Sequence, residues 1–174
     1  MQGVIPDIVT MAKGIGNGVP LAAVVTTPQI ASVLAKRIHF NTFGGNPVSC
    51  AAALETIRLL KAQLLRNAEV VGARLMAGLL ALADRHPFIG DVRGRGLMIG
   101  VELVRDRQTK ERAVEERVAV VNAAFRRGLL ILGAGPNTVR FCPPLIITAD
   151  EADTAVRLFD EALAEVEQTP RVGQ

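Results

Sequence analysis

The chain has 174 residues, of which 49% are hydrophobic and 21% are charged, proportions typical of a folded globular protein of one or two domains rather than a disordered chain. The net charge is only +3, and the aromatic residues, 3% of the chain, are all phenylalanine, so no nucleic-acid partner is expected. Every apolar run is far shorter than the ~20 residues of a membrane span, so no membrane partner is expected either.

Short apolar segments broken by glycine open the chain and predict a strand, a turn and a second strand. These elements cover residues 7–12, 14–18 and 21–26. A short helix is predicted over residues 28–36, and a polar, glycine-containing loop over residues 39–47.

A long helix is predicted next. Asn46 suits the N-cap position and Pro47 the first helical position. The helical pattern runs to about residue 84, with a break expected near Gln63 or Gly72, and His86 followed by proline ends it. The apolar residues that recur at helical spacing are Leu54, Ile57, Leu60, Leu64, Val71 and Leu75.

The rest of the chain alternates strands with two amphipathic helices, which predicts an α+β unit. The predicted strands cover residues 88–92, 97–104, 129–132 and 139–141. The first helix has one apolar face, made of Val114, Val118, Val121 and Phe125. Thr148 and Glu151 predict a capping box for the second helix. Its inward face is predicted to contain Ala152, Val156, Phe159, Leu163 and Val166. We expect a domain boundary near His86.

The cysteines and histidines predict neither a disulfide framework nor a metal site. Cys50 and Cys142 are too few for such a framework and lie in no CxxC motif, which favours buried thiols and a cytoplasmic location. His39 and His86 have no carboxylate or thiol at metal-ligand spacing.

Lys13 is the candidate for covalent chemistry. It is one of only four lysines among 20 basic residues, and it stands between a mostly apolar strand and Gly14. Partial desolvation in this position would lower the pKa of the lysine and make its neutral amine a nucleophile toward an aldehyde. The alternative is a lysine that ends a strand and extends into solvent.

Two further segments are candidates for binding anions. In residues 41–47, Thr42, two glycines and a predicted helix N-terminus together could bind a phosphate. Arg140 lies on a short apolar strand that ends in two prolines, where its guanidinium could clamp a carboxylate. The alternatives are a structural ion pair and a charge on an edge strand. The glycines of residues 14–18 match no nucleotide-binding motif and predict tight turns instead.

Four segments in this order resemble the class III aminotransferases, which are pyridoxal-phosphate enzymes of fold type I, and are nearest to the alanine-glyoxylate aminotransferase branch. The segments are PDIVTMAKGIGNGVPLAAVVTT, HFNTFGGNPVSCAAALETI, GDVRGRGLMIGVELV and VRFCPPLIIT. The resemblance implies an α/β fragment of that fold. Residues 1–85 would form the end of the large cofactor-binding domain with its long connecting helix, and residues 86–174 a small C-terminal α+β domain.

The resemblance also implies a role for each candidate residue. Lys13 corresponds to the Schiff-base lysine, which is also the general acid and base. Thr42 corresponds to a threonine that binds the cofactor phosphate of the neighbouring subunit, which implies a homodimer. Arg140 corresponds to an arginine that pairs with the substrate α-carboxylate. The cofactor would be pyridoxal 5'-phosphate, and the substrates an amino acid and a keto acid or aldehyde.

The chain departs from the family pattern through what it lacks. Family members are much longer, and their first half supplies a phosphate loop, an aromatic that stacks on the pyridine ring, and an aspartate that pairs with the pyridine nitrogen. Asp7 lies in the strand of the lysine itself and is not expected to replace that aspartate. Three functions therefore stay open: a transaminase portion, a phospho-lyase of the same branch, and a non-catalytic remnant that only folds or associates.

Overall fold

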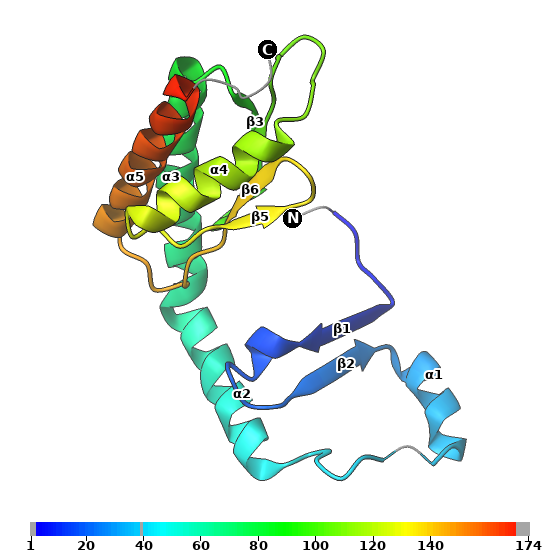
Figure 1. The fold of residues 1–174 in the computed structure, drawn as a ribbon. Coiled ribbons are helices and arrows are strands. Elements are labelled where there is room, and N and C mark those ends of the chain that lie inside the picture. The colour runs from blue at the N-terminus through cyan, green and yellow to red at the C-terminus, as the bar shows by residue number, and fades with distance from the viewer. Residues whose placement is uncertain (1–2, 39, 170–174) are drawn as a thin grey trace. The chain divides into compact units, whose positions relative to one another are not determined.

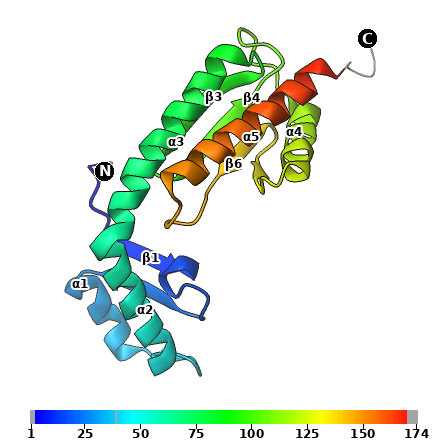
Figure 2. The same cartoon turned by 90° about the vertical axis from the view of Figure 1, so that its left-hand side faces the viewer.

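The computed structural model describes residues 3–38 and 40–169, so His39 lies outside the described residues. The chain forms two compact units, residues 1–63 and 64–174. Figures 1 and 2 show their elements in two views at right angles. The units divide inside the long helical segment, and the division into domains at residues 85 and 86 stays a prediction.

The first unit begins with the predicted strand, turn and strand. β1 (Ile8–Ala12) pairs antiparallel with β2 (Ala22–Thr26) (Figure 1). The short 3₁₀ helix η1 (Lys13–Ile15) follows β1 directly. The predicted short helix is present as α1 (Pro28–Ala31) continued by the 3₁₀ turn η2 (Ser32–Lys36).

The helix α2 (Pro47–Leu59) begins where the sequence predicts. The side chain of Asn46 caps it by accepting the N–H groups of Val48 and Ser49 at 3.0 and 3.1 Å. The helix contacts η1, and its buried residues are Ser49 and Ala53. Leu54 and Ile57, which belong to the helically spaced apolar residues of this segment, are exposed. A two-stranded ribbon and short helices, which make up the rest of the described first unit, do not cover that face.

The expected break in the long helix is a π-helical turn. This turn, η3 (Leu60–Leu64), joins α2 to α3 (Leu65–Arg85) and includes Gln63. The helix α3 ends at Arg85, immediately before His86, as predicted. Its residues Val71 and Leu75 are buried, so the second half of the predicted apolar face is confirmed.

The second unit is built on a four-stranded antiparallel sheet with the strand order β3-β4-β6-β5. The strands are β3 (Ile89–Arg95), β4 (Met98–Leu103), β5 (Leu132–Ala134) and β6 (Thr138–Phe141). β5 begins three residues later than predicted, because Leu132 is the residue that pairs with Arg140. Alternate residues of the central strands, such as Ile99, Val101 and Val139, are buried.

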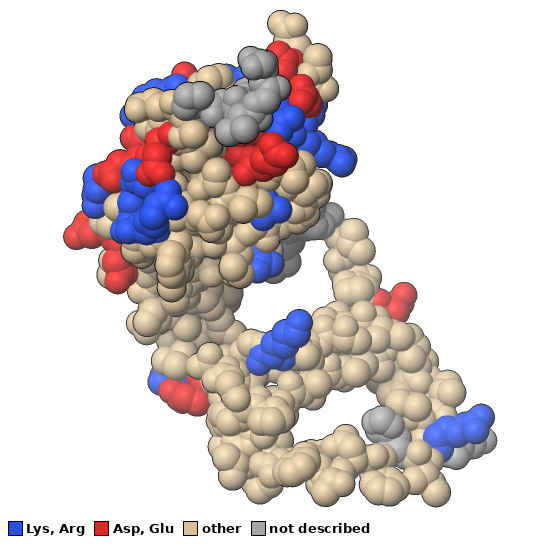
Figure 3. All heavy atoms as spheres, viewed as in Figure 1, with Lys and Arg blue, Asp and Glu red and all other residues tan. Residues whose placement is uncertain are grey.

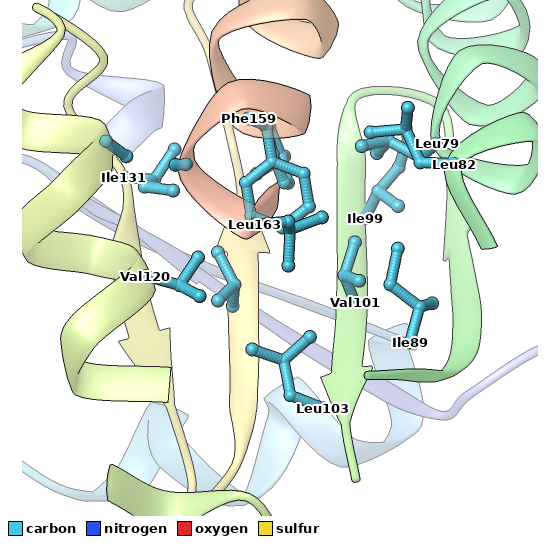
Figure 4. Close-up of a cluster of buried hydrophobic side chains, with 14 of the residues drawn as sticks. Leu79, Leu82, Ile89, Ile99, Val101, Leu103, Val120, Ile131, Phe159 and Leu163 are labelled. Carbon is cyan, nitrogen blue, oxygen red and sulfur yellow. The ribbon is translucent and has the colours of Figure 1, made fainter. Parts of the chain in front are cut away.

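The helices α3, α4 (Val114–Arg126) and α5 (Ala149–Gln168) cover the buried side of this sheet, as Figure 4 shows for the core side chains. Thr148 and Glu151 form the predicted capping box at the start of α5. Phe159 of α5 packs edge-on against Phe141 of β6, with ring centroids 5.1 Å apart. Figure 4 labels the core residues Leu79, Leu82, Ile89, Ile99, Val101, Leu103, Val120, Ile131, Phe159 and Leu163.

The buried face of α4 differs from the predicted one. Val114, Val118 and Phe125 are exposed, and the residues that face the core are mostly small. They are Glu116, Val120, Ala123 and Ala124. The alanines allow α4 to pack closely against the sheet and α5. The spacing of the large apolar residues in the sequence does not show that this face is the buried one.

Two glycines bring α3 close to the β3–β4 turn. A Cβ atom on Gly72 would lie 2.4 Å from the backbone carbon of Gly96, and Gly96 itself has a φ of +56°. Gly94 is similarly restricted, because a Cβ there would lie 2.2 Å from the carbonyl oxygen of Met98. These glycines are therefore required by close backbone contacts.

Charge is unevenly divided between the units. Of the 20 basic and 17 acidic residues, only seven lie within residues 1–63. In the face shown in Figure 3, the charged side chains gather on the second unit. Large apolar side chains of the first unit are exposed, among them Ile8, Val24, Val33, Phe40 and Val48.

None of the helices in the described part of the chain combines the length and the apolar character that a membrane span requires.

Candidate functional site

Lys13 stands where β1 ends and the turn η1 begins. Its φ is +54°, in the left-handed region that few residues other than glycine adopt, and such a strained conformation is frequent at functional sites. The side chain is exposed, so the desolvation expected from the sequence is wrong for the described chain. The reason is that β1 belongs to a two-stranded sheet with solvent on both faces. Among the described residues, the Lys13 amine has no hydrogen-bond or ion-pair partner.

Two glycines of the turn after Lys13 are required for different reasons. Gly16 is buried, and a Cβ atom there would lie 2.3 Å from the carbonyl oxygen of Val19. Gly18 has a φ of +112°, which side chains rarely allow. A positive φ therefore explains Gly18, whereas close approach of the backbone explains Gly16. The turn holds Lys13 at a defined place in the first unit, next to α2, which η1 contacts.

Thr42 lies in the turn that leads into α2. It is exposed, and within the described part of the chain neither its hydroxyl nor its N–H group is hydrogen-bonded. The same holds for the N–H groups of Phe43 and Gly45, and Gly45 has a φ of +68°. At the N-terminus of α2, the N–H groups of Val48 and Ser49 already donate to Asn46 Oδ1. The open donors of this segment therefore lie in the turn, and binding of an anion here stays a prediction.

Arg140 lies on β6 beside an open pocket of about 820 Å³ in the second unit. The pocket is mostly apolar, with Leu130, Leu132 and Phe141 among its lining residues. Glu151 also lines it, but this carboxylate accepts hydrogen bonds from Thr148 in the capping box, which lower its pKa. Arg140 is exposed and has no hydrogen bond or ion pair with any described residue, so the structural ion pair that its position also allowed is not formed.

The three candidate residues fall into two groups. Lys13 and Thr42 belong to the first unit, and Arg140 belongs to the second unit.

The two cysteines are not buried. Cys142, which lines the pocket beside Arg140, is exposed, and Cys50 is only partly buried. The expectation of two buried thiols is therefore wrong.

A polar cluster on β3 and β4, made of Arg93, Asp91 and Glu102, was not predicted from the sequence. The Nη1 atom of Arg93 lies 2.6 Å from Asp91 and 3.0 Å from Glu102, which lies on the neighbouring strand. A charged residue at every second position, Asp91, Arg93 and Arg95, was the signal that these side chains share one face of a sheet.

The first unit offers groups that suit pyridoxal phosphate. The aldehyde of that cofactor needs a primary amine, and its phosphate needs hydrogen-bond donors. Lys13 has an uncommitted amine, and the Thr42 hydroxyl and the N–H groups of Phe43 and Gly45 are uncommitted donors. The amine suits the aldehyde of the cofactor, and the donors of the turn suit a phosphate group.

Comparison with known proteins agrees with this chemistry. The family model "Aminotransferase class-III" matches residues 1–163. An alanine–glyoxylate aminotransferase 2 homologue of Arabidopsis thaliana is 50% identical over 168 residues, which cover 95% of this chain and 35% of the relative. A leucine/methionine racemase of Thermococcus litoralis is 43% identical over 172 residues, covering 98% of this chain and 39% of the relative.

A solved structure shows the same fold. The amine transaminase of an uncultivated Pseudomonas species, in a PLP-bound form, has a TM-score of 0.86 and 36% identity, covering 94% of this chain and 39% of its own. The family and this neighbour imply pyridoxal phosphate as the cofactor.

The relatives correct the expected location. The Arabidopsis relative is named a mitochondrial protein, and so is the human alanine–glyoxylate aminotransferase 2, which is 44% identical over 93% of this chain and 32% of its own length. Composition and cysteine number do not distinguish these compartments, so the inference of a cytoplasmic location is wrong.

The match covers nearly all of this chain but a minor part of each relative. The chain spans about a third of the length of the curated relatives, and about 40% of the transaminase chains that share its fold. The fold is accordingly a fragment of a fold type I transaminase. Because the family model matches residues 1–163, the chain belongs to the class-III aminotransferases.

Proposed function

We propose that this chain is the part of a pyridoxal-phosphate-dependent transaminase that carries the reactive lysine and the carboxylate-binding arginine. The observation that carries the proposal is Lys13, an uncommitted amine held in a left-handed conformation between β1 and a glycine turn. When bound, the cofactor supplies the electron sink for the reaction. Lys13 would be the residue that holds the aldehyde of the cofactor, and its Nζ, once the substrate amine has displaced it, would take a proton from the α-carbon of the substrate.

Thr42 is proposed to bind the cofactor phosphate. Its free hydroxyl and the free N–H groups of the same turn favour this role, because a phosphate oxygen accepts such hydrogen bonds strongly. The family resemblance suggests that this phosphate belongs to the neighbouring subunit, so the proposal includes a homodimer. In such a dimer each active site would need residues from both copies.

Arg140 is proposed to bind the carboxylate of the amino-acid substrate. Its guanidinium is unpaired beside an apolar pocket, where a planar fork of N–H groups suits a carboxylate. Bidentate binding would fix the orientation of the substrate, so that its amine and α-carbon face the reactive group rather than water. The proposed substrates are accordingly an amino acid and a keto acid or aldehyde.

A racemase is the second candidate, because one relative is named a leucine/methionine racemase and is 43% identical to this chain. A racemase also removes the α-proton but returns it to the other face of the same carbon, so Lys13 and Arg140 would serve both reactions. A phospho-lyase and a non-catalytic remnant are two further candidates, and an assay of the reaction products must separate them from a transaminase.

A chimera tests the function. This chain would replace the matching third of the Arabidopsis relative, with which it is 50% identical, and the product would be loaded with pyridoxal phosphate. We expect amino transfer from an α-amino acid, with neither racemisation nor phosphate release. The 174-residue chain alone is expected to show no turnover.

The role of Lys13 is tested separately in the chimera. Borohydride reduction followed by peptide mapping should place the pyridoxyl group on Lys13, and Lys13→Ala should abolish labelling and turnover. Labelling of Lys36, Lys61 or Lys110 instead would reject the assignment.

A further inference from the structure

The exposed face of the four-stranded sheet arranges its charged side chains in two rows across the strands. Arg93 of β3, Gly100 of β4 and Arg140 of β6 are direct neighbours in register, and Leu132 of β5 completes the row. The adjacent row contains Asp91, Glu102, Thr138 and Ala134. Residues directly opposite one another point to the same face, so an acidic row lies beside a basic row.

Both oxygens of the Glu102 carboxylate are engaged. Oε2 accepts a hydrogen bond from Arg93 Nη1 at 3.0 Å, and Oε1 accepts one from Asn137 Nδ2 at 3.3 Å. The same Nη1 atom donates to Asp91 Oδ2 at 2.6 Å. The hydrogen bond from Arg93 is the main reason that the pKa of Glu102 is lowered, which keeps this carboxylate charged.

Glu102 and Arg140 are nevertheless diagonal neighbours on this face. Glu102 is directly opposite Thr138, and Arg140 is two residues further along the same strand, opposite Gly100. Diagonal neighbours in an antiparallel pair are within reach of long side chains. Gly100 has no side chain to separate them. An ion pair between Glu102 and Arg140 is therefore sterically available but is not formed, and Arg140 stays unpaired among the described residues.

We propose that Arg93 is a positioning residue, which holds Glu102 away from Arg140 and so keeps the Arg140 guanidinium free for a substrate carboxylate. This inference rests on the proposed role of Arg140. Arg93 touches neither substrate nor cofactor in this scheme. Arg93 acts by hydrogen-bonding the carboxylate of Glu102. Without that bond, Glu102 could reach its diagonal neighbour Arg140 and compete with the substrate carboxylate for the guanidinium.

Loss of Arg93 would release Glu102. The carboxylate would turn toward Arg140, and the new ion pair would compete with any carboxylate ligand. Exposed ion pairs are weak, so the expected effect on Arg140 is about 1.5- to 5-fold. One nitrogen, Nη1, makes both Arg93 contacts, so a lysine at this position should keep most of the effect of the arginine.

The first experiment measures how readily the Arg140 guanidinium reacts in the 174-residue chain without any cofactor. Phenylglyoxal modifies free guanidinium groups, and peptide mapping gives the rate at Arg140 for each variant. We expect Arg93→Met to slow modification of Arg140 by about 1.5- to 5-fold, and Arg93→Met combined with Glu102→Gln to restore the original rate. Arg93→Lys should resemble the parent.

Arg95→Met is the matched control. Arg95 lies two residues further along β3, is exposed, and has no side-chain partner among the described residues, so its loss should leave the Arg140 rate unchanged. An unchanged Arg140 rate in Arg93→Met, or a slow rate that Glu102→Gln fails to restore, would overturn the inference.

The second experiment separates the inference from the proposed function. In the chimera, Arg93→Met should raise KM for an α-amino acid by the same factor with kcat unchanged, and should not affect an amine that lacks a carboxylate. If Arg140→Lys leaves KM for the amino acid unchanged, the carboxylate site is wrong and the inference falls with it. If only the Arg140 variant has an effect, the carboxylate site stands and the role of Arg93 is rejected.

Discussion

The imidazole of His86 lies between two carboxylates of α5, with its Nε2 atom 2.6 Å from Oδ1 of Asp160. Its Nδ1 atom lies 2.8 Å from Oε2 of Glu167, and the ring is buried. Each ring nitrogen is therefore within hydrogen-bonding distance of one carboxylate oxygen. The residue that ends α3 thus attaches that helix to α5.

Removing one carboxylate from this contact should destabilise the second unit. We expect Asp160→Asn to lower the free energy of unfolding by about 1 to 3 kcal/mol at pH 7, because it removes a charged partner from a buried ring. Urea unfolding measures the change. The control is Asp153→Asn, whose ion pair with Arg74 is half exposed, and we expect it to cost less than about 1 kcal/mol.

The effect of Asp160→Asn should depend on pH. Burial raises the pKa of Asp160, but the hydrogen bond and charge of His86 and the charge of Arg85 outweigh burial, so the pKa is lowered from its ordinary value of 3.8. The stabilisation is therefore complete above that value and is lost as the pH falls through the lower pKa of the folded state. The difference between Asp160→Asn and the parent should shrink on acidification, and a difference that grows instead would contradict this account.

Thr42→Val should weaken retention of the cofactor in the chimera. A lost hydrogen bond to a charged group is worth about 1.5 to 3 kcal/mol, or roughly 10- to 150-fold in affinity. Thr42 is exposed and unpartnered among the described residues, so the substitution should hardly change folding. Equilibrium dialysis gives the affinity, and thermal unfolding of the apo form provides the control. Equal affinity for parent and variant would reject the role of Thr42.

Arg140→Lys should lower kcat/KM for α-amino acids while the absorbance of the bound cofactor stays unchanged. Lysine keeps the charge but lacks the planar pair of donors that orients a carboxylate. Steady-state kinetics with an amino acid and with an amine of similar size measures the effect. An equal loss for both substrates would show that Arg140 acts other than through the carboxylate.

Backbone hydrogen exchange should differ between the two units of the 174-residue chain. The first unit buries few side chains and rests on a two-stranded sheet, whereas the second has a continuous core. We expect amides of β1 and β2 to exchange much faster than those of β4 and β6. Strong protection in β1, comparable to that in β4, would contradict the instability expected for the first unit.

The sequence alone determined the local structure and the family. Asn46 and Pro47 set the start of α2, and Thr148 with Glu151 set the start of α5, because a cap depends on neighbours in the chain. The four motifs were sufficient to recognise the class-III family, which the match over residues 1–163 confirms.

The tertiary structure decided what depends on residues distant in the sequence. Burial of Val120 and Ala123 instead of Val118 and Phe125 follows from the packing of α4 on the sheet and α5, which no helical period specifies. The exposure of Lys13 likewise depends on how much protein covers β1. The relation of Arg93 to Glu102 and Arg140 arises from strand register, which places side chains nine to 47 positions apart on one face. Register is set by the burial of the opposite face, so it becomes visible only when the sheet is assembled.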